Sequence, residues 1–503
     1  MPVDSRTPVI AGVGQVTNRP DPSDRDTRTE PLALMAQALE LAGSDAARSG
    51  ATRSSLLEKI DELTAIPSFV WHVRDPARAV AERLGVAARS TRLTFPGGTV
   101  PQSAVFDAAS RIASGELDVA VVVGAEAMKS RDLARRHEER VTWHVEADDV
   151  APAPPVFDVP DAMNDVERAA GLMVPAHAYA LIEHARRRAR GLSRAEHLDV
   201  LGALAARMSE VATRNEHAWL RDQIDPPAVT APSPANRMIA APYTKLLTSN
   251  VVVDMGAALI VCSLEAARAA GVPEDQLVFP VAGAFAREQW LLSERDELCV
   301  SLAMRACARW LFGDAPPPVD DLAMLDLYSC FPCAVQLAGD ALGIDVLTDE
   351  RPPSVTGGMT FFGGPGNNYV THSIATMTER LRRSPGATGL VTGLGWYLST
   401  HSWGTYSTSP PRDGFRARSV QTDVDAVALR AADDCYTGPA DVESYTVVHD
   451  RAGLASRAIV SLRTPAGARR LLATDDREVA AGIMASDPLG ERAAVGVKSI
   501  SFA

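Results

Sequence analysis

The stretch Ile112-Ala-Ser-Gly115-Glu-Leu-Asp118-Val-Ala-Val-Val-Val-Gly124-Ala-Glu-Ala-Met128 decides the fold of this 503-residue chain. Its apolar run, residues 119–123, predicts a strand that helices cover on both faces. The helical pattern of residues 101–113 comes directly before it and is followed by a glycine, Gly115. A helix that leads into a fully buried strand is typical of a layered α/β core.

Helix and strand patterns alternate on both sides of this stretch, as far as about residue 400. Gly12 and Gly14 begin a dinucleotide-like G-x-G motif, but no third glycine follows at the required spacing. We therefore do not predict a Rossmann nucleotide site. The alternation predicts an α/β core with strands at residues 8–14 and 251–262, and helices at residues 31–41 and 263–270.

A long insertion is predicted between the two halves of this core. Residues 130 to about 250 are first charged, then proline-rich and finally strongly helical, and residues 251–410 form the expected second half. Within the insertion, Ser193 and Glu196 have the Ser-x-x-Glu spacing of a capping box. Residues 409–414 are typical of a linker, so we place a domain boundary near residue 415.

Short β-rich segments follow the linker and are separated by Gly, Asp and Pro. This pattern predicts a small antiparallel barrel over residues 416–503, after a core domain over residues 1–415. The expected strands are residues 445–448, 458–462, 470–473 and 494–502.

Composition narrows the function classes. The net charge of −13 disfavours nucleic acid and anionic membranes as main partners. No apolar run is long enough to span a bilayer, and the first residues lack the basic and apolar segments of a secretory signal. The six cysteines are too scattered for a disulfide framework, so we expect a reducing compartment and a cytoplasmic location.

Four segments, in this order, resemble the thiolase superfamily. They are Pro8-Val-Ile-Ala-Gly-Val-Gly14, the stretch from Ile112 to Met128, Asp254-Met-Gly256-Ala-Ala-Leu and Gly363-Gly-Pro365-Gly-Asn-Asn. The resemblance covers residues 5–410. It implies two βαβαβαββ halves in α/β/α/β/α layers, and a site for coenzyme A or acyl-CoA thioesters.

Other segments resemble one subgroup, the actinobacterial thiolase-like proteins of type 1, which are related to sterol carrier protein thiolases. They are Pro96-Gly-Gly98, Leu327-Tyr-Ser-Cys-Phe-Pro332 and Gly363-Gly-Pro-Gly-Asn-Asn-Tyr369. Val442-Glu-Ser-Tyr-Thr-Val-Val-His449 resembles the extra β-domain of that subgroup. It also resembles the oligonucleotide-binding-type barrel of small proteins that partner thiolase-like aldolases.

The catalytic groups that the resemblance leads us to expect are missing. The family's nucleophilic cysteine, whose thiolate is stabilised at a helix N-terminus, falls on Gly98. A shift of one residue gives Gly97 or Thr99, and only the threonine could act, as a weak nucleophile. The family's histidine falls on Gly364, and its second cysteine falls in residues 391–395, which contain none. We therefore predict no standard thiolase chemistry.

Three remaining side chains are candidate catalytic residues. Tyr328 replaces the residue that holds an oxyanion-hole water in the family, and its phenol suits hydrogen bonding to a carbonyl or acid–base chemistry in an aldol cleavage. Cys330 is a candidate replacement nucleophile, and His372 is a candidate base. The alternatives are a packed tyrosine, an inert buried cysteine and a structural histidine.

Two regions are candidate ligand sites, and no metal site is predicted. The turn of Gly97, Gly98 and Thr99 before a helix leaves backbone amides for a carbonyl or an anion. Gly363, Gly364, Asn367 and Asn368 form a second turn, whose asparagines either support the turn or bond a pantetheine amide. Arg186 and Arg187 either meet coenzyme A phosphates, as the resemblance implies, or complete a helix C-terminus.

Three functions are consistent with these residues. The first is binding of acyl-CoA without thiolase chemistry, in lipid or sterol metabolism. The second is an active retro-aldolase or acyltransferase that uses Tyr328, His372 or Cys330. The third is a scaffolding subunit that contacts a protein partner through its C-terminal barrel. The resemblance also implies a homodimer, paired through an edge strand near residues 119–123.

Overall fold

The computed structural model describes residues 3–155, 161–313, 319–497 and 499–502. Its first sheet has the strand order β1-β7-β4-β2-β3, and every residue of the central β4 is buried, as its apolar sequence predicts. The strands are β1 (Pro8–Asn18), β2 (Ile60–Ile66), β3 (Ala88–Leu93), β4 (Val119–Ala127) and β7 (Asp254–Ser263).

The second sheet has the order β12-β8-β11-β10-β9, and both sheets mix parallel and antiparallel pairs. Its strands are β8 (Phe279–Arg287), β9 (Leu322–Asp326), β10 (Thr388–Gly395), β11 (Thr400–Ser407) and β12 (Arg416–Ser419). The strand β12 lies just beyond the boundary expected near residue 415, yet it still belongs to the core.

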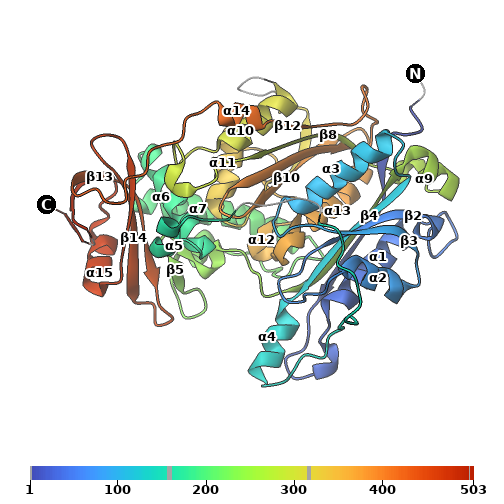
Figure 1. Ribbon diagram of the computed structural model, residues 1–503, viewed down its shortest axis with the longest axis horizontal. Coiled ribbons are helices and arrows are strands. Elements are labelled where there is room, and N and C mark those ends of the chain that lie inside the picture. Colours follow the sequence, from blue (N-terminus) through green and yellow to red (C-terminus); the bar gives the residue numbers. More distant parts are fainter. Residues whose placement is uncertain (1–2, 156–160, 314–318, 498, 503) are drawn as a thin grey trace.

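Helices form layers on and between the sheets, as the resemblance to thiolases implies. The central layer contacts both sheets and consists of α3 (Val100–Ala113) and α13 (Tyr369–Arg382). The outer face of the first sheet is covered by α1 (Pro31–Asp45), α2 (Pro76–Leu84) and α9 (Leu264–Ala270), and that of the second sheet by α10 (Leu302–Phe312). Figure 1 shows α3 and α13 between the two sheets.

The second half departs from the expected βαβαβαββ order. Residues 327–387, all of them described, contain α11 (Pro332–Leu342), α12 (Gly358–Phe361) and α13 but no strand. Pro352 and Pro353 have no amide hydrogen for a sheet ladder. The Asp326 carboxylate accepts the amides of Val355 at 3.0 Å and Thr356 at 3.2 Å, so this segment bonds to a side chain instead of a strand.

The insertion lies between β4 and β7 and is mostly helical. Its long helix α7 begins with the predicted capping box of Ser193 and Glu196. The elements are α4 (Met128–Arg136), α5 (Asp165–Ala170), α6 (Pro175–Ala189), α7 (Arg194–Thr213), α8 (Pro226–Thr230), β5 (Met238–Ala240) and β6 (Tyr243–Thr244). Residues 156–160 of the predicted insertion lie outside the described residues.

The C-terminal domain is an antiparallel sheet with the order β15-β14-β13-β16-β17. Its elements are β13 (Gly438–His449), β14 (Ala455–Arg463), β15 (Arg469–Thr474), α15 (Arg477–Ser486), β16 (Arg492–Val495) and β17 (Ile500–Phe502). Residues 498 and 503 of the predicted domain are outside the described part.

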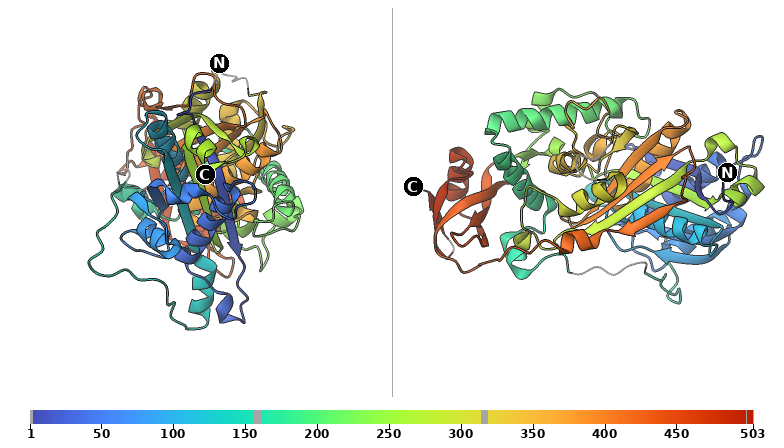
Figure 2. Two further views of the ribbon diagram at one scale, coloured as in Figure 1. Left: turned by 90° about the vertical axis from the view of Figure 1, so that its right-hand side faces the viewer. Right: turned by 90° about the horizontal axis from the view of Figure 1, so that it is seen from above.

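The closed barrel expected for this domain is not found. Among the described residues the edge strands β15 and β17 do not pair with each other. Instead α15 packs over β13 and β14, on the face that a barrel would enclose. The insertion extends the sheet, because Ala240 of β5 pairs with Val448 of β13. Figures 1 and 2 show the domain at the far end of the long axis from the N-terminus.

The expected dimer contact through residues 119–123 is contradicted by the sheet order. The strand β4 is central, and β2 and β7 occupy both of its hydrogen-bonding edges. It therefore has no free edge for another copy. No helix in the described ranges is both long and apolar enough to cross a bilayer.

Candidate functional site

A cavity of about 430 Å³ opens where the two halves of the core meet the insertion. Its wall combines the turn before α3, the segment after β9, the turn before α13, the first turns of α6 and the β10–β11 turn. None of the described residues that line it is charged. Its rim is apolar, since Phe69, Val174 and Val251 line it and are 44–48% exposed. This arrangement suits an uncharged ligand.

Several predicted site residues meet in this cavity. They are Gly97, Gly98, Tyr328, Cys330, Gly364 and Asn367. The remaining candidates lie elsewhere. Thr99 lines a separate hollow, and its hydroxyl is 3.3 Å from that of Thr400. Gly363 does not line the cavity, and a Cβ there would lie 3.2 Å from a methyl carbon of Val253.

At Gly98, the position predicted to correspond to the thiolase nucleophile, no room remains for a side chain. A Cβ on Gly98 would overlap the carbonyl oxygen of Leu394 and the hydroxyl of Tyr328, and would lie 2.7 Å from Tyr328 Cζ. Backbone and a ring of the core cannot yield as a flexible side chain does. The nucleophile's space is therefore filled, chiefly by Tyr328.

Gly364, the position predicted to correspond to the family's histidine, is also crowded, but by the ends of two side chains. A Cβ on Gly364 would lie 2.9 Å from Ser249 Oγ and 3.1 Å from Met359 Cε. Both side chains also line the cavity. The sequence predicts that two catalytic groups of thiolases are absent at these positions, and the structure shows which neighbouring atoms lie there.

The turn before α3 keeps two free backbone donors. The Gly97 amide donates to Asn367 Oδ1 at 2.8 Å. The amides of Gly98 and Thr99 have no hydrogen-bond partner among the described residues. Unpaired amides at the start of a helix favour a carbonyl oxygen or an anion.

The two asparagines of the second turn support the backbone. Asn367 accepts from Gly97 and donates to the Pro67 carbonyl at 2.8 Å. Asn368 donates to the Gly124 carbonyl at 2.6 Å, and its Oδ1 accepts from the Thr371 hydroxyl at 2.6 Å. With both ends of each amide engaged, the structural role that the sequence left open is the one observed.

Tyr328 and Cys330 face the cavity as neutral groups. Burial raises the pKa of Tyr328 well above its ordinary value, and burial raises the pKa of Cys330 to about 12. The Tyr328 hydroxyl has no hydrogen-bond partner among the described residues. It is therefore a free proton donor, while the thiol is not ionised at neutral pH and lacks the thiolate of a nucleophile.

His372 lies inside the core and not at the cavity. It is fully buried in α13, its Nδ1 is 2.9 Å from Gln15 Oε1, and its ring packs edge-on against Phe362. Burial lowers the pKa of His372 to about 3, so the ring is neutral. These contacts are those of a structural histidine.

Arg186 and Arg187 are held in ion pairs in the last turn of α6, at the other end of the helix from the residues that line the cavity. Arg186 pairs with Asp340 at 2.9 Å, and Arg187 Nη1 donates to Asp487 Oδ2 at 2.9 Å. Asp487 belongs to the C-terminal domain, so Arg187 joins that domain to the insertion. Neither arginine is available to the phosphates of a ligand in the cavity.

Sequence reasoning misses two polar atoms at the cavity. Ser249 Oγ and Trp396 Nε1 are both buried, and neither has a hydrogen-bond partner in the described parts of the chain. Both residues line the cavity. Their residue types carry no signal of a site, and only the fold brings residues 249 and 396 together.

A buried carboxyl supports the rim. Glu126 accepts the Phe69 amide at 2.6 Å and the Ser68 hydroxyl at 2.9 Å. A Cβ on Gly366, another lining residue, would lie 3.0 Å from Glu126 Cδ. Burial raises the pKa of Glu126 to about 7.

Comparison with solved structures identifies the family. The chain is similar to a monomeric SCP2-thiolase-like protein type 1 from Mycobacterium smegmatis, with 30% identity, full coverage of both chains and a TM-score of 0.81. This chain belongs to the SCP2-thiolase-like proteins of type 1. A family profile, the additional C-terminal domain of thiolase-like protein type 1, matches residues 419–498 of the chain.

More distant structures share the fold of this SCP2-thiolase-like protein. The Ltp2-ChsH2(DUF35) aldolase is 18% identical, covers 80% of this chain and 98% of its own, and has a TM-score of 0.58. An acetyl-CoA acetyltransferase from Syntrophomonas wolfei is 14% identical, covers 80% and 99%, and has a TM-score of 0.55. A comparison with curated proteins finds no match.

Proposed function

We propose that this SCP2-thiolase-like protein binds the acyl-thioester end of an acyl-CoA in the cavity and does not perform thiolase chemistry. The observation that carries the proposal is an uncharged cavity at the start of α3, in which donors remain but the nucleophile and base do not. A thioester carbonyl has one unpaired amide of the lining to accept from, that of Gly98.

Two further groups suit the pantetheine arm. Ser249 Oγ and Trp396 Nε1 have no hydrogen-bond partner among the described residues. An amide of the arm would supply the missing partners. The phosphates of coenzyme A would remain outside, because no described lining residue is cationic.

Titration calorimetry tests the proposal. We expect decanoyl-CoA to bind, and the thioester to be intact when the mixture is recovered and separated by chromatography. Trp396→Phe should weaken binding, because it removes one unpaired donor. Trp403→Phe is the matched control: Trp403 Nε1 is also buried and unpaired, but it does not line the cavity. Absence of binding to the unaltered protein would refute the proposal.

The free hydroxyl of Tyr328 favours a second candidate function, a lyase that acts on 3-hydroxyacyl-CoA. A neutral phenol can donate a hydrogen bond to the carbonyl that forms when the carbon–carbon bond breaks. Release of an aldehyde or ketone that Tyr328→Phe abolishes would establish this function. Turnover that survives Tyr328→Phe would exclude this role for the residue.

We also infer a monomer, the state of the similar protein from Mycobacterium smegmatis. The free edge of the first sheet is β3, and residues 154 and 155 cover its end: Leu93 donates to the Pro154 carbonyl at 3.2 Å and bridges to Pro155. A covered edge resists pairing with another copy. Light scattering coupled to size-exclusion chromatography should give the mass of one chain, and the mass of two chains would refute the inference.

A further inference from the structure

We propose that the C-terminal domain positions one wall of the cavity, through a relay in which Arg469 holds residues 292–296 and Arg295 holds the β10–β11 turn. The proposal deepens the proposed function because it concerns the same cavity. Its first test needs no ligand, so the two proposals can fail separately.

The wall in question is the turn between β10 and β11, where Trp396 and Tyr397 line the cavity. Trp396 and Leu398 have φ angles of 60° and 61°, in the left-handed region that bulky residues avoid. Each such residue costs about 1–3 kcal/mol and persists only where its surroundings hold it. The groups that hold this turn therefore decide the shape of the wall.

Two side chains hold the turn. The Tyr179 hydroxyl donates to the Trp396 carbonyl at 3.0 Å and accepts from the Leu398 amide at 3.0 Å. From the other side, Arg295 Nη2 donates to the Tyr397 carbonyl at 2.8 Å and to Ser399 Oγ at 3.3 Å. Arg295 is 2% exposed, so these bonds are shielded from water.

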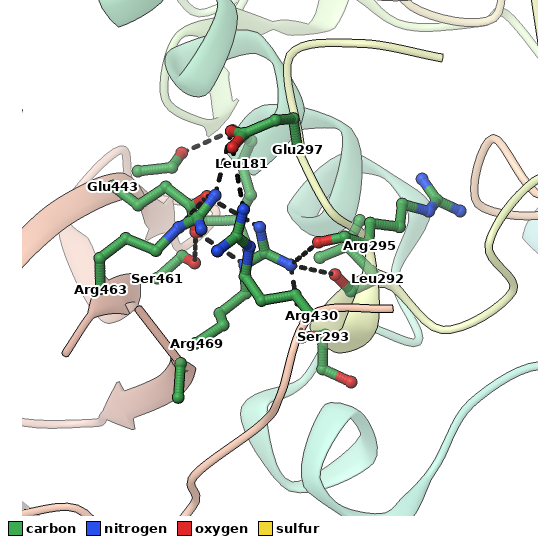
Figure 3. Close-up of polar contacts among 12 residues, drawn as sticks. Leu181, Leu292, Ser293, Arg295, Glu297, Arg430, Glu443, Ser461, Arg463 and Arg469 are labelled. Atoms are coloured by element: carbon green, nitrogen blue, oxygen red, sulfur yellow. Dashed lines mark hydrogen bonds and ion pairs between the residues drawn. The ribbon is translucent and has the colours of Figure 1, made fainter. Parts of the chain in front are cut away.

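The backbone around Arg295 is held in turn by the C-terminal domain (Figure 3). Arg469 makes a two-pronged pair with Glu443 at 2.7 and 2.8 Å. Its remaining donors reach the carbonyls of Leu292 and Ser293 at 3.3 Å, and that of Arg295. Five N–H groups in a rigid fork allow one arginine to fix both a carboxylate and a loop.

Two more arginines strengthen this contact. Arg463 donates to Glu443 at 2.7 Å and to Glu297 at 3.0 Å. Arg430 donates to the Asp296 carbonyl at 2.6 Å and to Glu297 at 2.9 Å. Residues 292–297 are thus bound to three arginines of the C-terminal part of the chain. The buried bonds from Arg469 to the backbone carbonyls of this loop leave it little freedom to move.

The helix that carries Tyr179 is attached to the same domain. Ser444 Oγ donates to the Leu181 carbonyl at 2.5 Å, and His184 Nδ1 lies 2.6 Å from the Tyr445 carbonyl. Both residues of the domain are in β13. The two side chains that hold the strained turn, Tyr179 and Arg295, therefore both depend on the C-terminal sheet.

The test uses the full chain and the fluorescence of Trp396, isolated by subtracting the spectrum of the same variant with Trp396→Phe. Arg295→Met removes the bonds to the turn. Arg469→Lys keeps a charge beside Glu443 but loses the fork. We expect both to shift Trp396 emission to the red and to make it more accessible to acrylamide. Decanoyl-CoA should bind about tenfold more weakly. A change of that size corresponds to the free energy stored in one strained residue of the turn, which the variants allow to relax.

Arg457→Met is the matched control. Arg457 also belongs to the C-terminal domain and donates to a carbonyl of the insertion, that of Ala169 at 2.7 Å, but it does not reach the turn. We expect it to leave Trp396 emission unchanged. Should Arg295→Met fail to fold, we expect Arg295→Lys to change Trp396 emission and quenching in the same direction, by a smaller amount. Unaltered Trp396 emission and quenching in the folded Arg295 and Arg469 variants would overturn the proposal.

Discussion

The cavity and the junction between the C-terminal domain and the core are built from opposite chemistry. The cavity lining carries no charge among the described residues, and a phenol, a hydroxyl and a thioether crowd Gly98 and Gly364, the positions predicted to correspond to the family's cysteine and histidine. The junction gathers Arg430, Arg463 and Arg469 around Glu443 and Glu297. Charged side chains in this molecule therefore fix one domain on another, whereas the cavity that we propose as the ligand site is lined by uncharged groups.

The largest effect is expected at the junction. Glu443→Gln leaves Arg469 buried without a counter-charge, which typically costs about 3–5 kcal/mol of folding stability. Urea denaturation followed by circular dichroism would measure the loss. Glu297→Gln is the matched control, because its side chain is 47% exposed and such pairs contribute about 0–1 kcal/mol. Equal losses of folding stability in Glu443→Gln and Glu297→Gln would contradict the expectation that the buried ion pair contributes more than the exposed one.

The same pair predicts a response to acid. Burial alone would raise the pKa of Glu443, but the hydrogen bond and charge of Arg469, with Arg463, lower it to about 2 from an ordinary 4.5. Stability from this group is present above pH 4.5 and is lost as the pH falls toward 2, by about 3 kcal/mol. The free energy of unfolding should therefore change less with pH in Glu443→Gln than in the unaltered protein.

The buried carboxyl beside the cavity, Glu126, should affect stability in the opposite direction with pH. Burial raises the pKa of Glu126 from an ordinary 4.5 to about 7, so the folded protein keeps a proton that the unfolded chain releases. The contribution of Glu126 to stability should fall as the pH rises from 4.5 to 7, by up to about 3 kcal/mol. Because other buried groups titrate in the same range, the measurement is the difference between the wild type and Glu126→Gln in thermal melts between pH 5 and 8, and the variant should gain stability relative to the wild type as the pH rises. The same pH dependence in both proteins would contradict the burial of an uncharged carboxyl.

Restoring the nucleophile should harm the protein without restoring activity. In Gly98→Cys the new side chain meets Leu394 and Tyr328, and overpacking of this kind costs about 1–3 kcal/mol. Gly364 also leaves the thiol without its base. Cleavage of acetoacetyl-CoA by this variant, followed by absorbance, would show that the cavity had kept its catalytic geometry.

The smallest effect on stability is expected for Ser249→Ala. The hydroxyl has no partner in the described chain, so its loss should change the free energy of unfolding by less than about 0.5 kcal/mol. Affinity for decanoyl-CoA should nevertheless fall by a factor of about 2–10, the value of one hydrogen bond. An unchanged affinity would place the ligand away from this wall.

The sequence predicted much of the core because its signals are local. The apolar run at residues 119–123 and the capping box at Ser193 can each be read from a few neighbouring residues. The first three C-terminal strands were also predicted, but residues 494–502 form two antiparallel strands, β16 and β17, and not one. A strand pattern also does not say whether a sheet closes. That depends on α15, which covers one face of the sheet.

The cavity was harder to predict because it depends on contacts between distant residues. Nothing near Gly98 in the sequence shows that Tyr328 occupies the space beside it. Likewise, nothing in the sequence shows that Ser249 lies beside Gly364. The residue type of His372 suits a catalytic base, but its surroundings do not. Only the packing of α13 shows that its ring faces Gln15 and Phe362. Arginines in a row at 186–188 suggested phosphate binding, while their partners Asp340 and Asp487 lie far along the chain.

A crystal structure of the protein soaked with decanoyl-CoA would show directly whether the cavity binds an acyl-CoA. We expect an intact thioester in the cavity, with its carbonyl oxygen at the amide of Gly98 and the pantetheine arm beside Ser249 and Trp396. A decanoyl group attached to Cys330, or an acyl-CoA bound elsewhere with this cavity empty, would contradict this expectation.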